Sequence, residues 1–209
     1  MLPYNFKRHS MKYFCRIILL LFCSLAVVAQ ENKSQQPLLL QNDLDWGVEH
    51  FKLPTGFAQE MTVSGIEEAY FPPGWSQIEN PEFWSYLFVW EIDSEQLLDE
   101  TKLEHNLTLY FNGLMGVPKD TIVPPKLPST TVVVTTQQNS ESSTAVGKVR
   151  TFDNFKTKKM MTLHLSVTQQ RCTQNGKVIL VFLFSPSAPG TPIWDTLQSF
   201  AIRDGYCEN

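Results

Sequence analysis

The sequence lacks the residue spacings on which most metal centres and hydrolytic active sites are built. Its 209 residues hold 4 histidines and 4 cysteines. None of them falls into H-E-x-x-H, C-x-x-C or another pattern typical of metal ligands. The G-x-S-x-G turn of nucleophilic serines and a glycine loop for phosphate are also missing. We therefore predict no metal and no cofactor, and the sequence favours a protein that is not an enzyme.

Basic residues are too few and too scattered for a nucleic acid partner. The chain has 17 lysines and arginines against 21 acidic residues, which gives a net charge of −4. Attraction to phosphate dominates binding to nucleic acids and to anionic membranes, so an acidic chain without basic clusters suits neither. We expect a protein, peptide or small-molecule partner instead, and the oligomeric state stays open.

No apolar run is long enough for a membrane-spanning helix, but a shorter one marks the N-terminus. In "MKYFCRIILLLFCSLAVVAQ", Lys12 and Arg16 precede an apolar stretch shorter than the about 20 residues of a spanning helix. Small residues precede and include Ala29, as in a secretory signal peptide. We predict cleavage after Ala29, export to the periplasm or the cell exterior, and no transmembrane segment afterwards. Cys23 leaves a lipoprotein open, although Phe22 is bulkier than lipid-attachment motifs normally allow.

Cleavage divides the chain into a signal peptide (1–29), a polar tether (30–45) and a single α/β domain (46–209). Loss of the four basic residues in 1–29 leaves 13 basic and 21 acidic residues, a net charge near −8. About 180 mature residues suit one domain with a sizeable core. Cys172 and Cys207 are the cysteines that remain. An exported protein commonly joins such a pair, so we predict a disulfide, with two free thiols as the alternative.

The stretch from Pro81 to Asp93, "PEFWSYLFVWEID", predicts a strand in the middle of a sheet. Alternate residues of a strand share a face, and both faces of this one are mostly apolar. One face holds Trp84, Tyr86, Phe88, Trp90 and Ile92, and the other Phe83, Ser85, Leu87, Val89 and Glu91. The four aromatic rings on the first face carry roughly 800 Å². A monomer leaves apolar patches of about 300–600 Å² exposed, so burial under the following helix is favoured over a binding surface.

Helical spacing follows that strand. Apolar residues recur in one stripe between Leu103 and Leu114, which predicts a helix. Asp93 or Ser94 is expected to cap its start, because a short side-chain oxygen accepts from the unpaired first-turn amides. Gly113 and Gly116 are expected to end it, because glycine enters the left-handed conformation at little cost.

Strand patterns dominate the rest of the chain. Strands are expected at 48–57, 61–71, 130–137, 145–153, 160–172 and 177–185. Asn175-Gly176 suits a two-residue turn between the last two of them. Thr191 as cap and Pro192 at the first position begin an amphipathic C-terminal helix. The fold class predicted is α+β, an antiparallel sheet of about six to seven strands packed between two main helices.

This element order, opening with "FKLPTGF" and closing with "IWDTLQSFAI", resembles the PsbP-like/DcrB-like family of exported α/β proteins. The resemblance covers about residues 46–203 and includes an F-x-L-P-x-x-F-like first strand and a final helix ending in SF-x-I. It implies an antiparallel sheet between helices in a binding or accessory protein without a shared catalytic site. The segment "EEAYFPPGWSQIENPEFW" departs from the family pattern, and no functional residue is carried over.

His164 is the catalytic candidate among the polar residues. In "MTLHLSVT" it shares a polar face with Thr162, Ser166 and Thr168, where a histidine can act as a general base. The plainer interpretation is a half-exposed strand residue with one hydrogen bond. The adjacent Glu67 and Glu68 point to opposite faces of their strand and so cannot form a catalytic pair by themselves.

Aromatic residues around two prolines form the candidate ligand-binding site. In "YFPPGW", rigid prolines can hold Tyr70, Phe71 and Trp75 outward to stack on a sugar ring or a peptide. The alternative is a loop folded back onto the core. Glu91, near the end of a mostly apolar strand, is expected to reach water, although a raised pKa is conceivable there.

These observations predict an exported single-domain protein of the cell envelope or secreted fraction. We expect it to be a non-enzymatic ligand-binding or accessory module. The alternative is a hydrolase or isomerase that uses His164 with a nearby carboxylate. The sequence does not identify the ligand.

Overall fold

The computed structural model describes residues 38–41, 43–117, 127–138, 141–172 and 174–208. From Leu38 onward the chain forms one compact unit. The predicted signal peptide, its cleavage site, Cys23 and residues 30–37 of the predicted tether lie outside the described residues.

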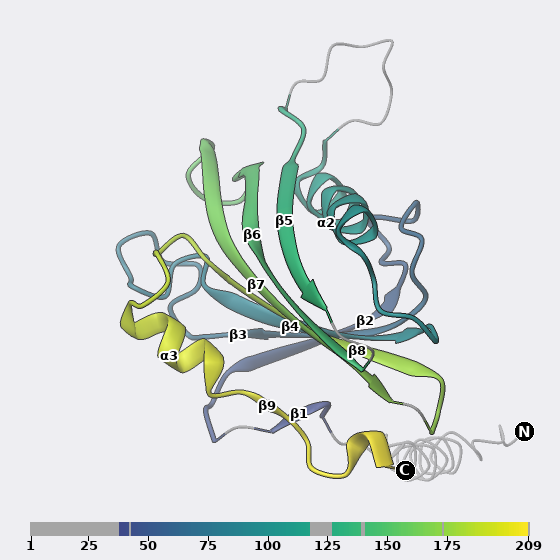
Figure 1. Ribbon diagram of the computed structural model, residues 1–209. Coiled ribbons are helices and arrows are strands. Elements are labelled where there is room, and N and C mark those ends of the chain that lie inside the picture. The colour runs from purple at the N-terminus through teal and green to yellow at the C-terminus, as the bar shows by residue number, and fades with distance from the viewer. Residues whose placement is uncertain (1–37, 42, 118–126, 139–140, 173, 209) are drawn as a thin grey trace, which may run out of the picture. The chain divides into compact units, whose positions relative to one another are not determined.

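The described chain contains one large sheet, one small sheet and two α-helices (Figure 1). The strands are β1 (Leu40–Gln41), β2 (Gly47–Leu53), β3 (Gly65–Phe71), β4 (Tyr86–Asp93), β5 (Thr131–Gln138), β6 (Ser142–Phe152), β7 (Met160–Cys172), β8 (Lys177–Ser185) and β9 (Ala201–Ile202). The helices are α2 (Glu100–Met115) and α3 (Pro192–Gln198), followed by a short 3-10 helix, η1 (Tyr206–Glu208).

Seven strands form an antiparallel sheet in the order β2-β3-β4-β8-β7-β6-β5, and β1 pairs with β9 in a separate two-stranded sheet. The predicted mixed α/β fold with an antiparallel sheet of six to seven strands is therefore confirmed. The chain after α2 returns to the far edge of the sheet and fills it inward from β5 to β8. Strands far apart in the sequence, β4 and β8, thus become neighbours at its centre.

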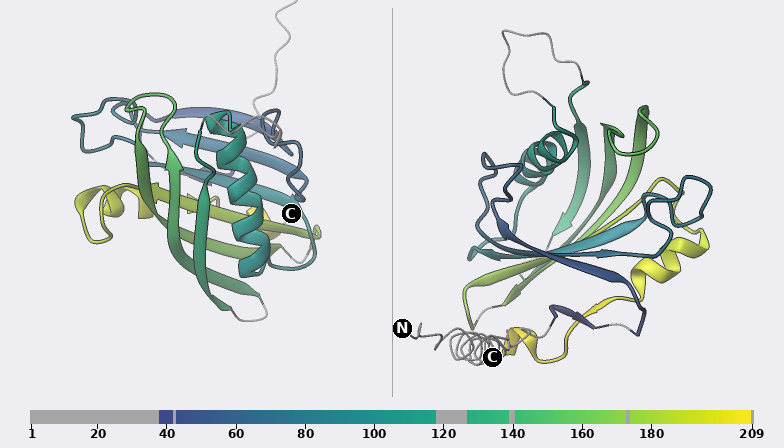
Figure 2. Two further views of the ribbon diagram at one scale, coloured as in Figure 1. Left: turned by 90° about the horizontal axis from the view of Figure 1, so that it is seen from above. Right: turned by 180° about the vertical axis from the view of Figure 1, so that it is seen from behind.

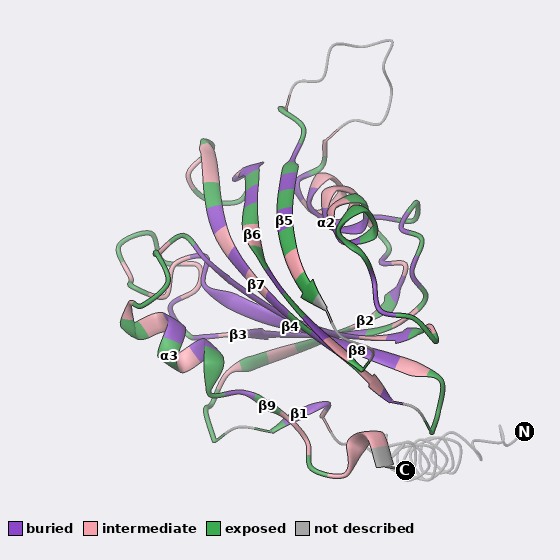
Figure 3. Ribbon diagram, in the orientation of Figure 1, coloured by how far each residue is buried: buried purple, intermediate pink, exposed green. Residues whose placement is uncertain are grey.

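The central strands β4 and β8 are apolar on both faces, which is why they lie in the middle of the sheet (Figure 3). On β4, Phe88 and Trp90 belong to one buried cluster, which also contains residues of α2. Leu87 and Val89 belong to a second cluster, which contains residues of α3. The ring centroids of Phe88 and Phe182 on β8 lie 4.7 Å apart. The aromatic stretch is therefore core rather than a binding surface.

Helix α2 begins later than the sequence suggested. Its N-cap is Asp99, whose side chain accepts from the Lys102 amide at 2.8 Å, instead of Asp93 or Ser94. Asp93 is the last residue of β4 and pairs with Lys177 across the strands, so it is not free to cap a helix. The helix ends as expected at Gly116, which has φ +70°.

The buried face of α2 follows the predicted stripe. Its buried residues are Leu103, Asn106, Leu107, Tyr110, Phe111 and Met115. Gly113 lies inside the helix instead of ending it. A Cβ there would stand 2.1 Å from the carbonyl oxygen of Phe57. The glycine therefore permits close packing of α2 against the loop that follows β2.

Helix α2 lies beside β5, which has β6 as its strand partner on the other side (Figure 2). Polar side chains of α2 bind this free edge of β5. The Val134 amide donates to Glu104 at 3.0 Å, and the Thr136 amide donates to Glu100 at 2.7 Å. About two turns beyond Glu104, Asn112 accepts from the amide of Thr130, just before β5, at 2.7 Å. Four helix residues rise about 6 Å, close to the span of two strand residues at about 3.4 Å each. This match lets successive helix turns saturate alternate amides of an edge strand.

The segment predicted to be a tether is partly folded into the domain. Leu39 and Leu40 are buried, and β1 pairs with β9 beyond α3. Both leucines belong to the buried cluster that also contains Trp194 and Leu197 of α3. The compact unit therefore includes the chain from Leu38, because the "LLL" run supplies apolar surface to the cluster that contains residues of β3, β4 and β8.

A disulfide joins Cys172, at the end of β7, to Cys207 in η1. It ties the C-terminal segment to the sheet. The hairpin beside it differs from the prediction. Cys172 pairs with Lys177, so four residues instead of two connect β7 to β8. Gly176 has φ +67° in this turn.

The α2–β5 contacts lead to a test of edge protection. Replacing Glu104 by alanine leaves the Val134 amide without its acceptor, so we expect a loss of about 1–2 kcal/mol in the free energy of unfolding. Glu104→Gln keeps an acceptor oxygen and is expected to retain most of the stability. Urea unfolding of both variants measures the difference, with the exposed Glu95→Ala as a control. Equal losses in the alanine and glutamine variants would contradict a role for this hydrogen bond.

Candidate functional site

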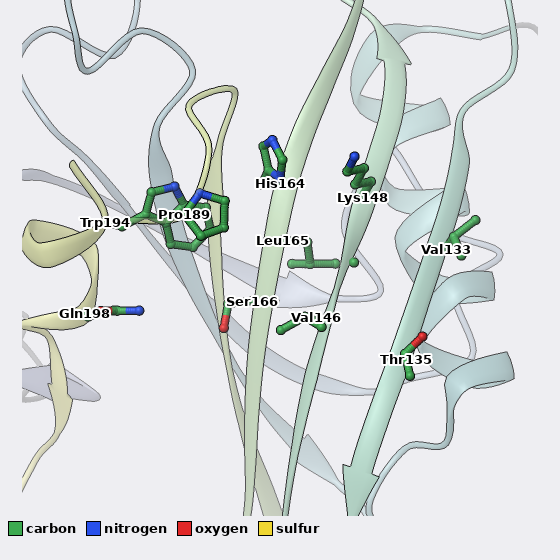
Figure 4. Close-up of a pocket in the computed structure, with 11 residues that line it drawn as sticks. Val133, Thr135, Val146, Lys148, His164, Leu165, Ser166, Pro189, Trp194 and Gln198 are labelled. Carbon is green, nitrogen blue, oxygen red and sulfur yellow. The ribbon is translucent and has the colours of Figure 1, made fainter. Parts of the chain in front are cut away.

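A cavity of about 460 Å³ lies between the edge half of the sheet and α3 (Figure 4). Strands β5, β6 and β7 form one side, and α3 with the loop before it forms the other. The lining residues are Val133, Thr135, Val146, Gly147, Lys148, His164, Leu165, Ser166, Pro189, Trp194 and Gln198.

Strand alternation explains which side chains reach this cavity. Val132 and Val134 on β5, like Leu163 and Leu165 on β7, join the core cluster under α2. Their neighbours in sequence must then face the opposite side of the sheet. Helix α3 packs with β8. The outward face of β5 to β7 remains open beside it, and the exposed fractions of Val133 and Val146 are 59% and 64%.

The α3 side of the cavity is held by a buried tryptophan. The indole Nε1 of Trp194 donates to the Ser187 carbonyl at 2.8 Å. Its ring belongs to the core cluster that includes Leu197 and Phe200. Pro189 and Gln198 flank it along the cavity. Packing therefore fixes this wall to the core, and the hydrogen bond ties α3 to the loop before it.

The charged and titratable side chains that line the cavity are both basic. Lys148 on β6 and His164 on β7 are direct partners in the strand register. Figure 4 shows them side by side, at one end of the strand segments that line the cavity. Among the described residues, neither side chain has a hydrogen-bond or ion-pair partner in the chain. The lining residues include no aspartate or glutamate.

The catalytic candidate His164 is thus part of the cavity, together with Ser166 from the same face of β7. The carboxylate that a hydrolase or isomerase would need beside it is not among the lining residues. Sequence reasoning singled out His164 but missed Lys148, Val146 and Trp194. The signal for Lys148 and Val146 was the alternation of "AVGKVRTFD", which leaves both on an outward face.

The three aromatics proposed as a ligand-binding site do not share a surface. Tyr70 is fully buried in the cluster with α3, where its hydroxyl donates to Glu68 at 2.6 Å. Phe71 points to the other side of β3, and its ring centroid lies 5.6 Å from that of Tyr86. Trp75 packs against Phe71 at 5.1 Å. The loop is folded onto the core, because adjacent strand residues cannot present their rings on one face.

Two adjacent glutamates are buried on opposite faces of β3, as the strand period requires. Glu67 accepts from Trp90 Nε1 at 2.6 Å and from the Tyr110 hydroxyl at 2.9 Å. Burial raises the pKa of Glu67 from 4.5 to about 7, although the two hydrogen bonds act in the opposite direction. On the other face, Glu68 also accepts from the Leu39 amide at 2.8 Å. These acids belong to the core and do not line the cavity.

Glu91 is held by neighbours and does not extend freely into water, which corrects the expectation for this residue. The Tyr206 hydroxyl donates to its carboxylate, and Lys177 Nζ lies 3.5 Å from it. Burial and the bond to Glu91 raise the pKa of Tyr206 well above its usual range. Glu91 therefore helps to attach η1 to the sheet.

Comparison with known proteins returned no matching family model, no matching curated protein and no matching solved structure. Within the described part of the chain, no three histidine, cysteine or acidic side chains are arranged to hold a metal ion. The helices that the structure describes are too short or too polar to cross a membrane.

The buried Glu67 predicts a pH-dependent stability. Its pKa in the folded chain lies above the unfolded value, so its contribution is fully present below about pH 4.5 and is lost as the pH rises through about 7. We expect the free energy of unfolding to fall by on the order of 3 kcal/mol between pH 5 and 8 from this group. Glu67→Gln stays neutral and should lack this decline, whereas the exposed Glu79→Gln should keep it. Urea unfolding across this pH range provides the measurement, and identical profiles for Glu67→Gln and the wild type would contradict the assignment.

Proposed function

We propose that the protein is an exported, non-enzymatic binding or accessory module whose cavity between α3 and β5–β7 holds a small ligand. The observation that carries this proposal is the open, partly apolar cavity between α3 and the outward face of β5 to β7. Its volume of about 460 Å³ falls within the roughly 300–1,000 Å³ of small-molecule sites.

The composition of the cavity supports binding. Val133, Val146 and Pro189 present apolar surface, and a few polar groups, among them Ser166 and Gln198, are placed around it. Such a mixture is typical of ligand sites, where apolar contact supplies affinity and polar groups fix orientation. Covering two exposed valines with a ligand also removes apolar surface from water, which is favourable by about 25 cal/mol per Å².

Export and family are further parts of the proposal. The N-terminal sequence has the features of a signal peptide, and the disulfide between Cys172 and Cys207 is of the kind that persists in oxidising compartments. We also propose a PsbP-like/DcrB-like fold with the sheet between the two main helices. In the large sheet, β2 to β4 come before α2, and β5 to β8 come between α2 and α3, which supports this. The separation of α2 and α3 into different core clusters supports it as well.

The enzymatic alternative receives less support from the site. A general base needs a partner that orients it, and proton transfer of this kind commonly relies on a carboxylate near the histidine. Lys148 stands opposite His164 instead. We therefore favour binding over a hydrolase or isomerase that uses His164.

Titration with a panel of small amphipathic molecules, which includes 1-octanol, tests the binding function. We expect the amide resonances of Val146, His164 and Ser166 to shift in NMR spectra. Val146→Glu places a charge on the apolar surface and should weaken binding at least about tenfold, because burying an unpaired charge is costly. Ile78→Glu introduces the same charge at an exposed apolar residue that does not line the cavity and should have no effect. If no molecule of the panel shifts these resonances, the proposed function is wrong.

A further inference from the structure

We propose that the ligand of this cavity is a small amphipathic carboxylate, with its headgroup between Lys148 and His164 and its apolar body along Val146. The inference rests on the proposed binding function and adds the chemical class of the ligand. It follows from three observations: the pairing of the two basic residues, the absence of acids among the lining residues, and the arrangement of apolar surface beside them.

The first observation is geometric. Lys148 and His164 are directly opposite each other on antiparallel strands, where Cβ atoms are about 4.5–5.5 Å apart. Figure 4 shows both side chains on the cavity side of the sheet. A carboxylate has two oxygens, so one can accept from the ammonium group and the other from an imidazole N–H. The site thus offers two donors at the separation that one headgroup spans.

The second observation is electrostatic. Acidic residues outnumber basic ones, 21 to 17, yet none of them lines the cavity. Within the described residues, Lys148 has no ion-pair partner, although Lys177 is paired with both Glu91 and Asp93. An anion from solution would supply the missing partner. The hydrogen bonds to such a charged group are stronger than those between neutral groups.

The number of charges favours a carboxylate over a phosphate. Lysine supplies one permanent positive charge, and the cavity lining contains no arginine for bidentate contact with a phosphate. The presence of a single lysine and no arginine in the lining also argues against an anionic membrane surface, for which several clustered basic residues are typical. A monoanionic headgroup matches what the side chains provide.

The third observation concerns the body of the ligand. Val146 is two residues from Lys148 on β6, on the same face and about 7 Å along the strand. Val133, the register partner of Lys148 on β5, adds a second exposed apolar side chain. In Figure 4, Ser166 and Gln198 lie toward the end away from the two basic residues. The polar head and the apolar body therefore have separate places in one cavity.

Octanoate and 1-octanol form the test pair, because they share the same chain length and differ in the headgroup. With the protein expressed from the full-length chain, NMR titration should show octanoate binding about tenfold more tightly than 1-octanol, as expected for hydrogen bonds to a charged group. Lys148→Met and His164→Phe should each reduce affinity for octanoate while leaving that for 1-octanol unchanged. Lys156→Met, which removes an exposed lysine outside the cavity, is the matched control and should alter neither.

The outcomes separate this inference from the proposed function. Equal affinity for octanoate and 1-octanol at the cavity resonances would overturn the carboxylate assignment and leave the binding function intact. Tighter binding of octyl phosphate than of octanoate would overturn it as well, in favour of a dianionic headgroup. Absence of binding by all three molecules, and by the wider panel, would overturn both. Loss of the octanoate preference in Lys148→Met but not in Lys156→Met would support the inference.

Discussion

The structure depends on the burial of β4 and β8 from both sides. These two strands carry apolar side chains on each face, so each face requires a cover. Helix α2 contributes to the cluster on one face, whereas α3 and the β1–β9 pair contribute to the cluster on the other. Burial of aromatic surface of this size far outweighs any single hydrogen bond, and it therefore sets the position of the other elements.

The cavity follows from the limited extent of the second cover. Helix α3 has 7 residues and packs with β8, so it leaves the outward face of β5, β6 and β7 open. On the other face, α2 has 16 residues and reaches as far as β5. The positions of the two helices, α2 alongside β5 and α3 beside β8, thus leave the outward face of β5 to β7 open. The side chains there alternate with core residues, which keeps their backbone positions rigid.

Three glutamates on β3 and β4 have structural roles, unlike the basic residues that line the cavity. Glu67, Glu68 and Glu91 are each satisfied by a tyrosine hydroxyl, with a tryptophan, a backbone amide or a lysine as a further partner. They attach α2, β1 and η1 to the sheet. The two basic residues of the cavity differ from them, because neither Lys148 nor His164 has a hydrogen-bond or ion-pair partner among the described residues.

Local structure was predictable from the sequence: the alternating faces of the aromatic strand from Tyr86 onward, the stripe of α2 with its end at Gly116, and α3 with Pro192 at its start. These features depend on periodicity and on residues next to each other in the chain, so they are readable without a fold. His164 was found in the same way, from the alternation of β7. The start of the aromatic strand was predicted wrongly, because Trp84 has φ +52° in a turn before β4. Three features appear only in the folded chain: β5 lies at the edge of the sheet, Glu100 and Glu104 bind its free amides, and Leu39 and Leu40 belong to the core. The tertiary structure also decided that Lys148 stands opposite His164 beside Trp194, because this juxtaposition depends on strand order and register, which a single strand's pattern does not contain.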